Sequence, residues 1–515
     1  MSSDVETSLT TDPPVAEPVA TASSREGASG PSNAGGGSPL QRVGKFISDM
    51  FPGGFRQYTM IIALLALILF FEYKSDGKMV TSANFQGLIA ANTHVLILAI
   101  GMLMVIVVGH IDLAVGSTAG LVGVTMAWMA REYSLPWYIA VLVGLGLGLL
   151  IGAWQGFFLA KVGIPGFITT LAGLIGFRGA VIWISHSVAI PPPVELYHFA
   201  NGSLPDWGRE WTASLGLGST GRAANDWPYE HFGLNVVTLA LGVAIIIAFC
   251  YTTLQGRSRQ LKASGVAPSL VAVLARLVAV SAVIGFVFYL FASGRPGTGF
   301  PLTGVVLLVL VLVYHIITER TPFGRHIYAV GGNKAAAALT GVSVPRTYFL
   351  VMLNMSLLAA LVGILFTGRS NSAFPSLGNG WELDAIASVF IGGAAVSGGI
   401  GTVVGTMVGG MVMAVLNSGL SLLGVGSDKT AVIKGLVLLA AVAFDIYNKQ
   451  QGRKSLIGRI MEGFSGTKSE SDEVAVVPAE ATTAAGVVET GPEIQANIDG
   501  ITPAKLRDEL TPTDE

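Results

Sequence analysis

The sequence predicts an all-α polytopic membrane protein, and three observations carry this prediction. Hydrophobic residues make up 51% of the 515 residues, and only 12% are charged, against roughly 25% in ordinary soluble domains. The mean hydropathy is +0.64. Many of the charges lie in the two terminal regions, so the middle of the chain is more apolar still. We expect about 10–12 transmembrane helices, some of them short or re-entrant.

Apolar runs along the chain define the candidate spans. A helix needs about 20 predominantly apolar residues to cross the hydrocarbon core of a membrane. The candidate spans are 58–73, 87–108, 112–131, 137–160, 166–187, 234–253, 271–292, 303–318, 347–367, 385–398, 402–424 and 429–447. The first and the tenth of these are short, so we expect tilted, partial or re-entrant segments there.

The two ends of the chain have a different composition. Residues 1–56 precede the spans and residues 449–515 follow them; both stretches are polar and rich in small residues, with no apolar run long enough to build a core. We expect disordered tails there and a transmembrane domain over 57–448. The N-terminal stretch also lacks the charged start and apolar centre of a cleaved signal peptide.

Lysine and arginine in the loops predict the orientation. Counting crossings from a cytoplasmic N-terminus places the basic loop 255–265 and the segment 319–346 inside, with both termini cytoplasmic. The loops 191–233 and 367–383 fall outside, although both contain arginine. The tryptophan-rich loop 191–233 has two interpretations: an aromatic belt at the membrane interface or a docking face for a partner outside the membrane.

The sequence lacks the residues that several classes of function require. The single cysteine, Cys250, excludes a disulfide framework and a cysteine metal site. The net charge of -2 gives no indication of nucleic-acid binding. No G-x-S-x-G elbow, H-E-x-x-H pair or intramembrane carboxylate pair stands in the sequence. We therefore expect no catalytic residues and no metal site.

The glycine-rich segment 319–346 suggests a phosphate loop at first sight. A P-loop needs G-x-x-x-x-G-K-[ST], whereas Lys334 is followed by alanine and the glycine spacing is wrong. The pattern instead predicts a short helix from Lys334 to Leu339, with Asn333 as N-cap and Gly341 ending it. Such a helix suits insertion into a groove on another protein or a position on the membrane surface.

Two acidic residues lie at predicted membrane edges. Asp112 stands in "VVGHIDLAVGS" between two apolar runs, and Asp384 begins the run at 385. Both are interpreted as N-caps, while a carboxylate near the membrane is also a candidate functional group. His110 is interpreted as a hydrogen-bonded side chain, with a proton relay as the alternative.

A second glycine-rich stretch covers 384–420. Gly401, Gly405 and Gly409 recur every four residues, which on one helix would let another helix approach closely. The letters "GGAAVSGGIG" indicate a turn between a short helix and a longer one. Helix packing and a wall of the permeation pathway are both compatible with this pattern.

Four motifs together resemble one family, the sugar ABC transporter permeases of the ribose, galactose and xylose branch. They are "GHIDLAVGS", "KVGIPGFITTLAGLIGFRG", "TPFGRHIYAVGGNKAAAALTGVSVPR" and "DAIASVFIGGAAVSGGIGTVVGT", in that order. The resemblance runs from about 58 to 447, nearly all of the membrane part. His110 replaces a family glycine and Ala114 a family serine, so we expect the local geometry of that turn to differ from the family's. The long outer loop and the extra spans around 271–318 are similar to the xylose-type permeases.

The resemblance implies three groups of site residues. The ATPase-coupling group is Gly324, Arg325, Tyr328, Gly331, Gly332, Asn333, Ala336, Ala337 and Gly341. The helix cap and turn group is Gly109, Asp112, Gly116 and Ser117. The group for helix packing or the pathway is Gly392, Gly393, Gly398, Gly399, Gly401, Gly405 and Gly409.

The resemblance also implies the permease subunit of an importer in the cell membrane, carrying a monosaccharide and favouring a pentose such as xylose. Separate ATPase subunits would bind ATP and magnesium, so no cofactor is expected on this chain. A solute-binding protein would deliver the sugar, and a second copy of the permease would complete a homodimer in the lipid bilayer. The alternative is an ion-coupled secondary sugar transporter. The scarcity of Asp, Glu, Lys and Arg in the predicted helix centres speaks against it.

Overall fold

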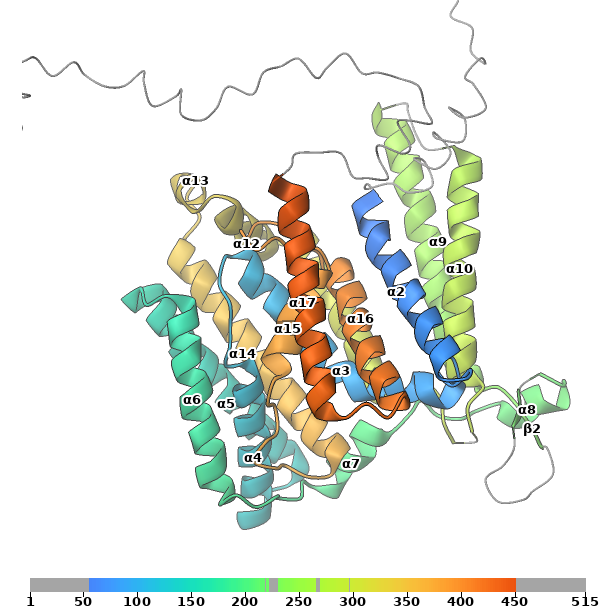
Figure 1. Cartoon of the computed structure of the whole chain (residues 1–515), viewed down its shortest axis with the longest axis horizontal. Helices are drawn as coiled ribbons and strands as arrows, with labels where there is room; N and C mark the ends of the chain where they lie inside the picture. The colour runs from blue at the N-terminus through green and yellow to red at the C-terminus, as the bar shows by residue number, and fades with distance from the viewer. Residues whose placement is uncertain (1–54, 218, 222–229, 265–268, 296, 451–515) are drawn as a thin grey trace, which may run out of the picture. The chain divides into compact units, whose positions relative to one another are not determined.

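The computed structural model describes residues 55–217, 219–221, 230–264, 269–295 and 297–450. The tails predicted over 1–56 and 449–515 lie almost wholly outside the described residues. The described chain is a bundle of helices with one small antiparallel pair of strands (Figure 1). Its elements are α2 (Phe55–Lys74), α3 (Ser82–Val107), α4 (Val115–Glu132), α5 (Trp137–Phe157), η1 (Phe158–Val162), α6 (Gly166–Ser185), α7 (Val194–Asn201), α8 (Arg209–Ser214), β1 (Ser219–Gly221), β2 (Glu230–Phe232), α9 (Val236–Ser264), α10 (Leu270–Ala292), α11 (Leu302–Arg320), α12 (Pro322–Gly332), α13 (Lys334–Leu339), α14 (Val344–Ser370), α15 (Trp381–Ile391), α16 (Val403–Leu422) and α17 (Ser427–Gln450).

The predicted all-α membrane fold is confirmed. Within the described residues, eight helices are long and apolar enough to cross a membrane: α3, α5 continued by η1, α6, α9, α10, α11, α14 and α16. Helices also cover the other predicted spans, as α2, α4, α15 and α17. The run at 385–398 gives only the 11 residues of α15, which at 1.5 Å per residue reach about half-way across the hydrocarbon core.

The core sits around α3 and α14. Of the most apolar part of α3, 78% is buried, because α11, α14, α15 and α16 all pack on it. A helix that is apolar all round, as α3 is, belongs in such a central position. Helix α14 packs against α5. The α5 glycines at 148, 152 and 156 each lie against backbone or side-chain atoms of α14. Small residues at this spacing let two helices approach closely.

The outer helices present apolar side chains outward. The apolar parts of α6, α9 and α10 are only 22%, 11% and 17% buried. Trp183, Ile247 and Val278 are among the exposed side chains. Soluble proteins rarely expose apolar surface on this scale, whereas lipid-facing helices require it.

The two ends of the bundle differ (Figure 1). One end, here named the α13 end, carries α12 and α13, the start of α2 and the end of α17. The opposite end, named the α8 end, carries α7, α8 and the strand pair. The residues 191–233, predicted as one long loop, thus contain short helices and strands of their own.

Two helix pairs run in opposite directions and meet inside the bundle. Helix α3 ends at the α13 end, and residues 108–114 carry the chain back inward to the start of α4. Helix α14 begins at the α13 end, and residues 371–380 carry the chain back inward to the start of α15. The starts of α4 and α15 touch, because the backbones of Gly116 and Gly378 lie against each other. Such inverted, interrupted helices are typical of transport proteins.

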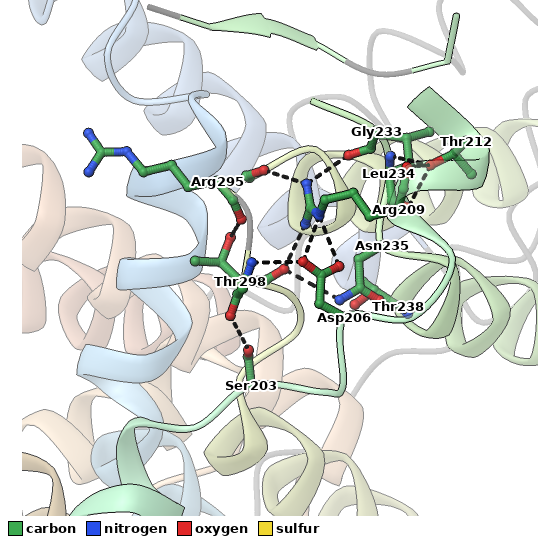
Figure 2. A network of polar contacts seen from close by, with 12 residues as sticks. Ser203, Asp206, Arg209, Thr212, Gly233, Leu234, Asn235, Thr238, Arg295 and Thr298 are labelled. Carbon is green, nitrogen blue, oxygen red and sulfur yellow. Dashed lines mark hydrogen bonds and ion pairs between the residues drawn. The ribbon is translucent and has the colours of Figure 1, made fainter. Parts of the chain in front are cut away.

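At the α8 end, one buried arginine holds α8 in place (Figure 2). The Arg209 guanidinium is paired with Asp206 at 2.7 Å. It also donates to the backbone carbonyl groups of Gly233, Gly294 and Thr298 at 2.7–2.9 Å. The α8 segment is therefore fixed to the segment between α10 and α11, since these bonds satisfy a charge that would otherwise be costly to bury.

Candidate functional site

Helix α12 was not predicted from the sequence. Local hydrogen bonding at its first turn explains why these residues form a helix. Thr321 is its N-cap, accepting a hydrogen bond from the Gly324 N–H at 3.2 Å. Gly324 allows the tight turn out of α11, because a methyl group there would overlap the carbonyl oxygens of Ile317 and Thr318. Ile327 is fully buried within the main hydrophobic core, so α12 packs against the bundle.

Three backbone segments meet where α12 ends. A methyl group on Gly331 would overlap the Val107 carbonyl oxygen at the end of α3 and would lie 2.8 Å from the Gly399 nitrogen. The Gly399 N–H donates to the same Val107 carbonyl at 2.8 Å. Gly399 has φ +74°, a conformation that favours glycine. The end of α12 is thus joined directly to α3 and to the turn between α15 and α16.

Tyr328 makes a second link to that turn. Its hydroxyl donates to the Gly401 carbonyl oxygen at 2.8 Å. Burial raises the pKa of Tyr328 above its ordinary value, and the nearby Glu319 carboxylate raises it further. The hydroxyl therefore remains protonated, and able to donate this bond, throughout the neutral range.

Helix α13 occupies the predicted residues, Lys334–Leu339. Asn333 is its N-cap, as expected, and accepts a hydrogen bond from the Ala336 N–H at 3.0 Å. Gly341 follows the helix with φ +85°, the left-handed conformation that ends many helices. The Lys334 ammonium lies 5.5 Å from the centre of the Tyr348 ring, which connects α13 to the start of α14.

The predicted coupling residues divide into two sets. Arg325, Gly332, Asn333, Ala336 and Gly341 are exposed. Gly324 and Ala337 are buried, and Tyr328 and Gly331 are partly buried, so these four shape the segment rather than offer it to a partner.

One exposed residue of this segment was missed. Leu339 is 90% exposed, at the end of α13. Its position as the one large apolar side chain after four alanines is the signal that could have found it. We name the exposed face formed by Arg325, Gly332, Ala336 and Leu339 the α13 face.

The cap at the start of α4 differs from the prediction. Ala114, not Asp112, is the N-cap residue, and it makes no side-chain cap. The Asp112 carboxylate, 1% exposed, accepts a hydrogen bond from the Ala114 N–H at 2.8 Å, so it forms an Asx turn just before the helix. Ser117 donates to the Ala114 carbonyl at 3.0 Å.

The histidine that departs from the family pattern fits this turn. The positive φ of the turn belongs to Gly109, at +87°, and not to His110. Position 110 therefore needs no glycine. The His110 ring packs instead against the ring of Tyr348, with centroids 4.5 Å apart.

The late glycines mostly serve the packing of α15 against α16. A methyl group on Gly392 would lie 2.5 Å from the Gly405 carbonyl oxygen, and one on Gly409 would overlap the Ser388 carbonyl oxygen. Gly401 was expected on the same helical face, but it lies in the turn, because α16 begins only after the Thr402 cap. Gly393 and Gly398 also lie in this turn.

Asp384 was predicted as an N-cap, and this was wrong. Helix α15 begins at Trp381, so Asp384 lies within its first turn. Both of its carboxylate oxygens accept hydrogen bonds from Lys434 of α17, at 2.8 and 2.9 Å. The pair joins α15 to α17, a connection that a count of charges along the sequence does not reveal.

Further charges gather where α4 and α15 meet. The Glu382 carboxylate lies against Gly116, and its Oε2 is buried without a hydrogen-bond partner in the described structure. On α6, Arg178 donates to the Leu377 carbonyl at 3.0 Å. Neither Glu382 nor Arg178 was singled out from the sequence. In the described part of the chain, no group of three or more His, Cys, Asp or Glu residues could hold a metal ion.

Comparisons with known proteins agree with this architecture. Residues 84–442 match the family described as branched-chain amino acid transport system / permease component. The xylose transport system permease protein of Escherichia coli is 33% identical over 394 residues, which is 76% of this chain and 92% of that protein. The corresponding protein of Haemophilus influenzae is 32% identical, over 76% of this chain and 97% of its own length.

A ribose protein is also similar. The ribose import permease protein of Escherichia coli is 30% identical over 391 residues, covering 76% of this chain and 93% of that protein. No solved structure matches the chain significantly. The fold and the site define a multi-pass membrane permease. The chain belongs to the family of the branched-chain amino acid transport system permease component, and it is a transport subunit rather than an enzyme.

Proposed function

We propose that this chain is the permease subunit of an ATP-driven (ABC) importer of a monosaccharide, a pentose such as xylose. The observation that carries the proposal is the α13 face, a small exposed surface joined through backbone contacts to α3 and to the turn between α15 and α16. The similarity to xylose and ribose permeases over more than nine-tenths of their lengths supports the sugar.

In this proposal the α13 face contacts a separate ATPase subunit, which binds ATP and magnesium. The small side chains of α13 leave room for the walls of a groove, and Leu339 supplies the apolar anchor. A partner that binds two states of the permease with different affinity shifts the population between them. The Val107, Gly331 and Gly399 contact would carry that shift into the bundle.

Charge distribution supports a cytoplasmic α13 end. The last turns of α9, with Arg257, Arg259 and Lys262, lie at this end, as do α12 and α13 with Arg325 and Lys334 (Figure 1). Lysine and arginine are enriched in cytoplasmic loops. The start of α2 and the end of α17 lie at the same end, so both tails would begin in the cytoplasm.

At the α8 end, the proposal places a solute-binding protein. Trp207 and Trp211 are 72% and 63% exposed, and the Arg209 network holds them on a rigid support. Rigid, exposed aromatic residues are typical anchors of protein interfaces. An aromatic belt in the lipid interface is the other use of these side chains.

A second permease copy would cover α6. Phe167, Ile175 and Trp183 are 55%, 65% and 77% exposed on this helix. Burial of such a face against an equivalent face stabilises a two-fold dimer. The remaining apolar surface of α9 and α10 would face lipid.

One observation favours a second candidate function, an ion-coupled sugar transporter. The Asp384 and Lys434 pair is partly buried between α15 and α17, and intramembrane charges are common in proton and sodium pathways. The similarity to import permeases argues against it.

One experiment separates the two functions. The chain is reconstituted in liposomes with its ATPase subunit and its sugar-loaded binding protein, and xylose uptake is measured. The ABC proposal expects uptake that requires ATP and the binding protein and that survives an ionophore. Uptake by the chain alone, driven by an ion gradient, would contradict it.

A further inference from the structure

An open cavity of about 440 Å³ lies beside the meeting point of α4 and α15. This volume falls within the range of roughly 300–1,000 Å³ that small-molecule sites occupy. Its lining comes from one face of α6, from the segment that leads into α15 and from the first turn of α15: Leu174, Arg178, Ile182, Pro375, Ser376, Asn379 and Glu382.

The wall of the cavity is held from two sides. The Arg178 Nη1 donates to the carbonyl oxygens of Leu377 and Pro375, at 3.0 and 3.5 Å. On the other side, methyl groups on Gly116 or Gly120 would crowd the backbone at 377–378, at distances no larger than 2.5 Å. The segment 375–380 is therefore clamped between α6 and α4, and the cavity is a feature of the packed structure.

The polar groups of the cavity suit an uncharged ligand with many hydroxyl groups. Glu382 lines the cavity, and its carboxylate supplies hydrogen-bond acceptors. Arg178 supplies donors, while Asn379 and Ser376 supply both. Each hydroxyl of a sugar donates and accepts, so it can bridge a carboxylate and a guanidinium. The charges of Glu382 and Arg178 cancel, which disfavours a free ion as the ligand.

The apolar part of the lining fits the same ligand. Leu174, Ile182 and Pro375 present aliphatic surface beside the polar groups. A monosaccharide ring has C–H faces and a rim of hydroxyl groups, so it needs both kinds of surface. A small number of polar groups on an apolar wall is the usual composition of a small-molecule site.

Helix α15 connects the cavity to the α13 face. Glu382 lies in the first turn of α15, and α15 ends in the turn whose Gly399 and Gly401 contact Gly332 and Tyr328 of α12. A movement of α12 would thus be passed along a single short helix to the Glu382 wall. We propose that this cavity holds an uncharged monosaccharide during its passage, through Glu382, Arg178 and Asn379; the proposal rests on the sugar-permease function given above.

The test measures sugar uptake by the complete reconstituted transporter for xylose and for its single-deoxy analogues. The variants are Glu382→Gln and Asn379→Leu. Asn379 is exposed, so its substitution should not disturb folding. The second variant therefore keeps the test usable if Glu382→Gln does not fold. The matched control is Glu195→Gln, the same chemical change on exposed α7. For each sugar, the ratio of variant to wild-type uptake is compared, which cancels the contribution of the binding protein.

We expect Glu382→Gln to lower xylose uptake about tenfold, with no such loss for the deoxy analogue that lacks the hydroxyl recognised by Glu382. Glu195→Gln should leave every ratio near one. Equal losses for all sugars in both cavity variants, or no loss in either, would overturn the cavity proposal while leaving the permease function intact. Failure of the wild-type transporter to take up any sugar would instead refute the proposed function, and this proposal with it.

Discussion

The neighbouring glycines at the end of α12 give a sharp test of the backbone contact. A methyl group on Gly331 would overlap the Val107 carbonyl oxygen, whereas one on Gly332 would meet nothing within 4 Å. Overpacking costs about 1–3 kcal/mol, and the change from glycine to alanine in a helix returns up to about 1 kcal/mol. Gly331→Ala should therefore destabilise the protein by about 1–2 kcal/mol, and Gly332→Ala should be neutral or slightly stabilising.

The assay is thermal unfolding of both variants in the same lipid nanodiscs, followed by reconstituted uptake. Gly331→Ala is expected to lower the unfolding temperature by about 1–3 °C, because the entropy of unfolding grows with chain length, and to reduce sugar uptake, because α12 must move away from α3. Gly332→Ala is expected to match the wild type in both measurements. Equal behaviour of the two variants would refute the inference that Gly331 holds α12 against α3 and the α15–α16 turn.

The other predictions concern partner binding and the internal ion pair. Gly332→Trp should leave the unfolding temperature near that of the wild type but uncouple ATP hydrolysis from uptake, because it fills open space on the α13 face; normal transport would place the ATPase contact elsewhere. Leu339→Asp should weaken ATPase binding measured by co-purification without lowering stability, since Leu339 is 90% exposed; unchanged co-purification would exclude Leu339 as an anchor. Lys434→Met should destabilise the protein by about 3 kcal/mol, because it leaves Asp384 unpaired inside the bundle. Adding Asp384→Leu should recover most of that loss, and a double variant as unstable as the single one would argue against the pairing.

Hydropathy predicted the long helices well because their signal is local. Apolar runs such as 271–292 and 402–424 became α10 and α16 with shifts of one or two residues at their ends. The re-entrant geometry was harder. Only the shortness of the run at 385–398 indicated that a helix would stop part-way, and nothing local indicated that 108–114 and 371–380 return into the bundle. That depends on glycine contacts between segments far apart in the sequence, such as Gly116 with Gly378.

The candidate site was predictable where local chemistry decides it. Asn333 and Gly341 bound a short helix through capping rules that depend on a few neighbouring residues. The role of Gly331 depends on Val107, more than two hundred residues earlier, and the partner of Asp384 lies on α17. Glu382 could not be distinguished from an ordinary helix-start acid until α4 and α6 were placed around it.

The central claim, that the α13 face binds the ATPase subunit, is tested most directly by cross-linking. Cys250 is the only cysteine, so Cys250→Ser gives a background in which a single new cysteine reports its neighbours. Leu339→Cys at the α13 face is compared with Trp211→Cys at the α8 end, both exposed, in the assembled transporter with a short bifunctional reagent. We predict a cross-link from position 339 to the ATPase subunit and none from position 211. A cross-link from position 211, or none from position 339 in a complex that hydrolyses ATP and transports sugar, would contradict the claim.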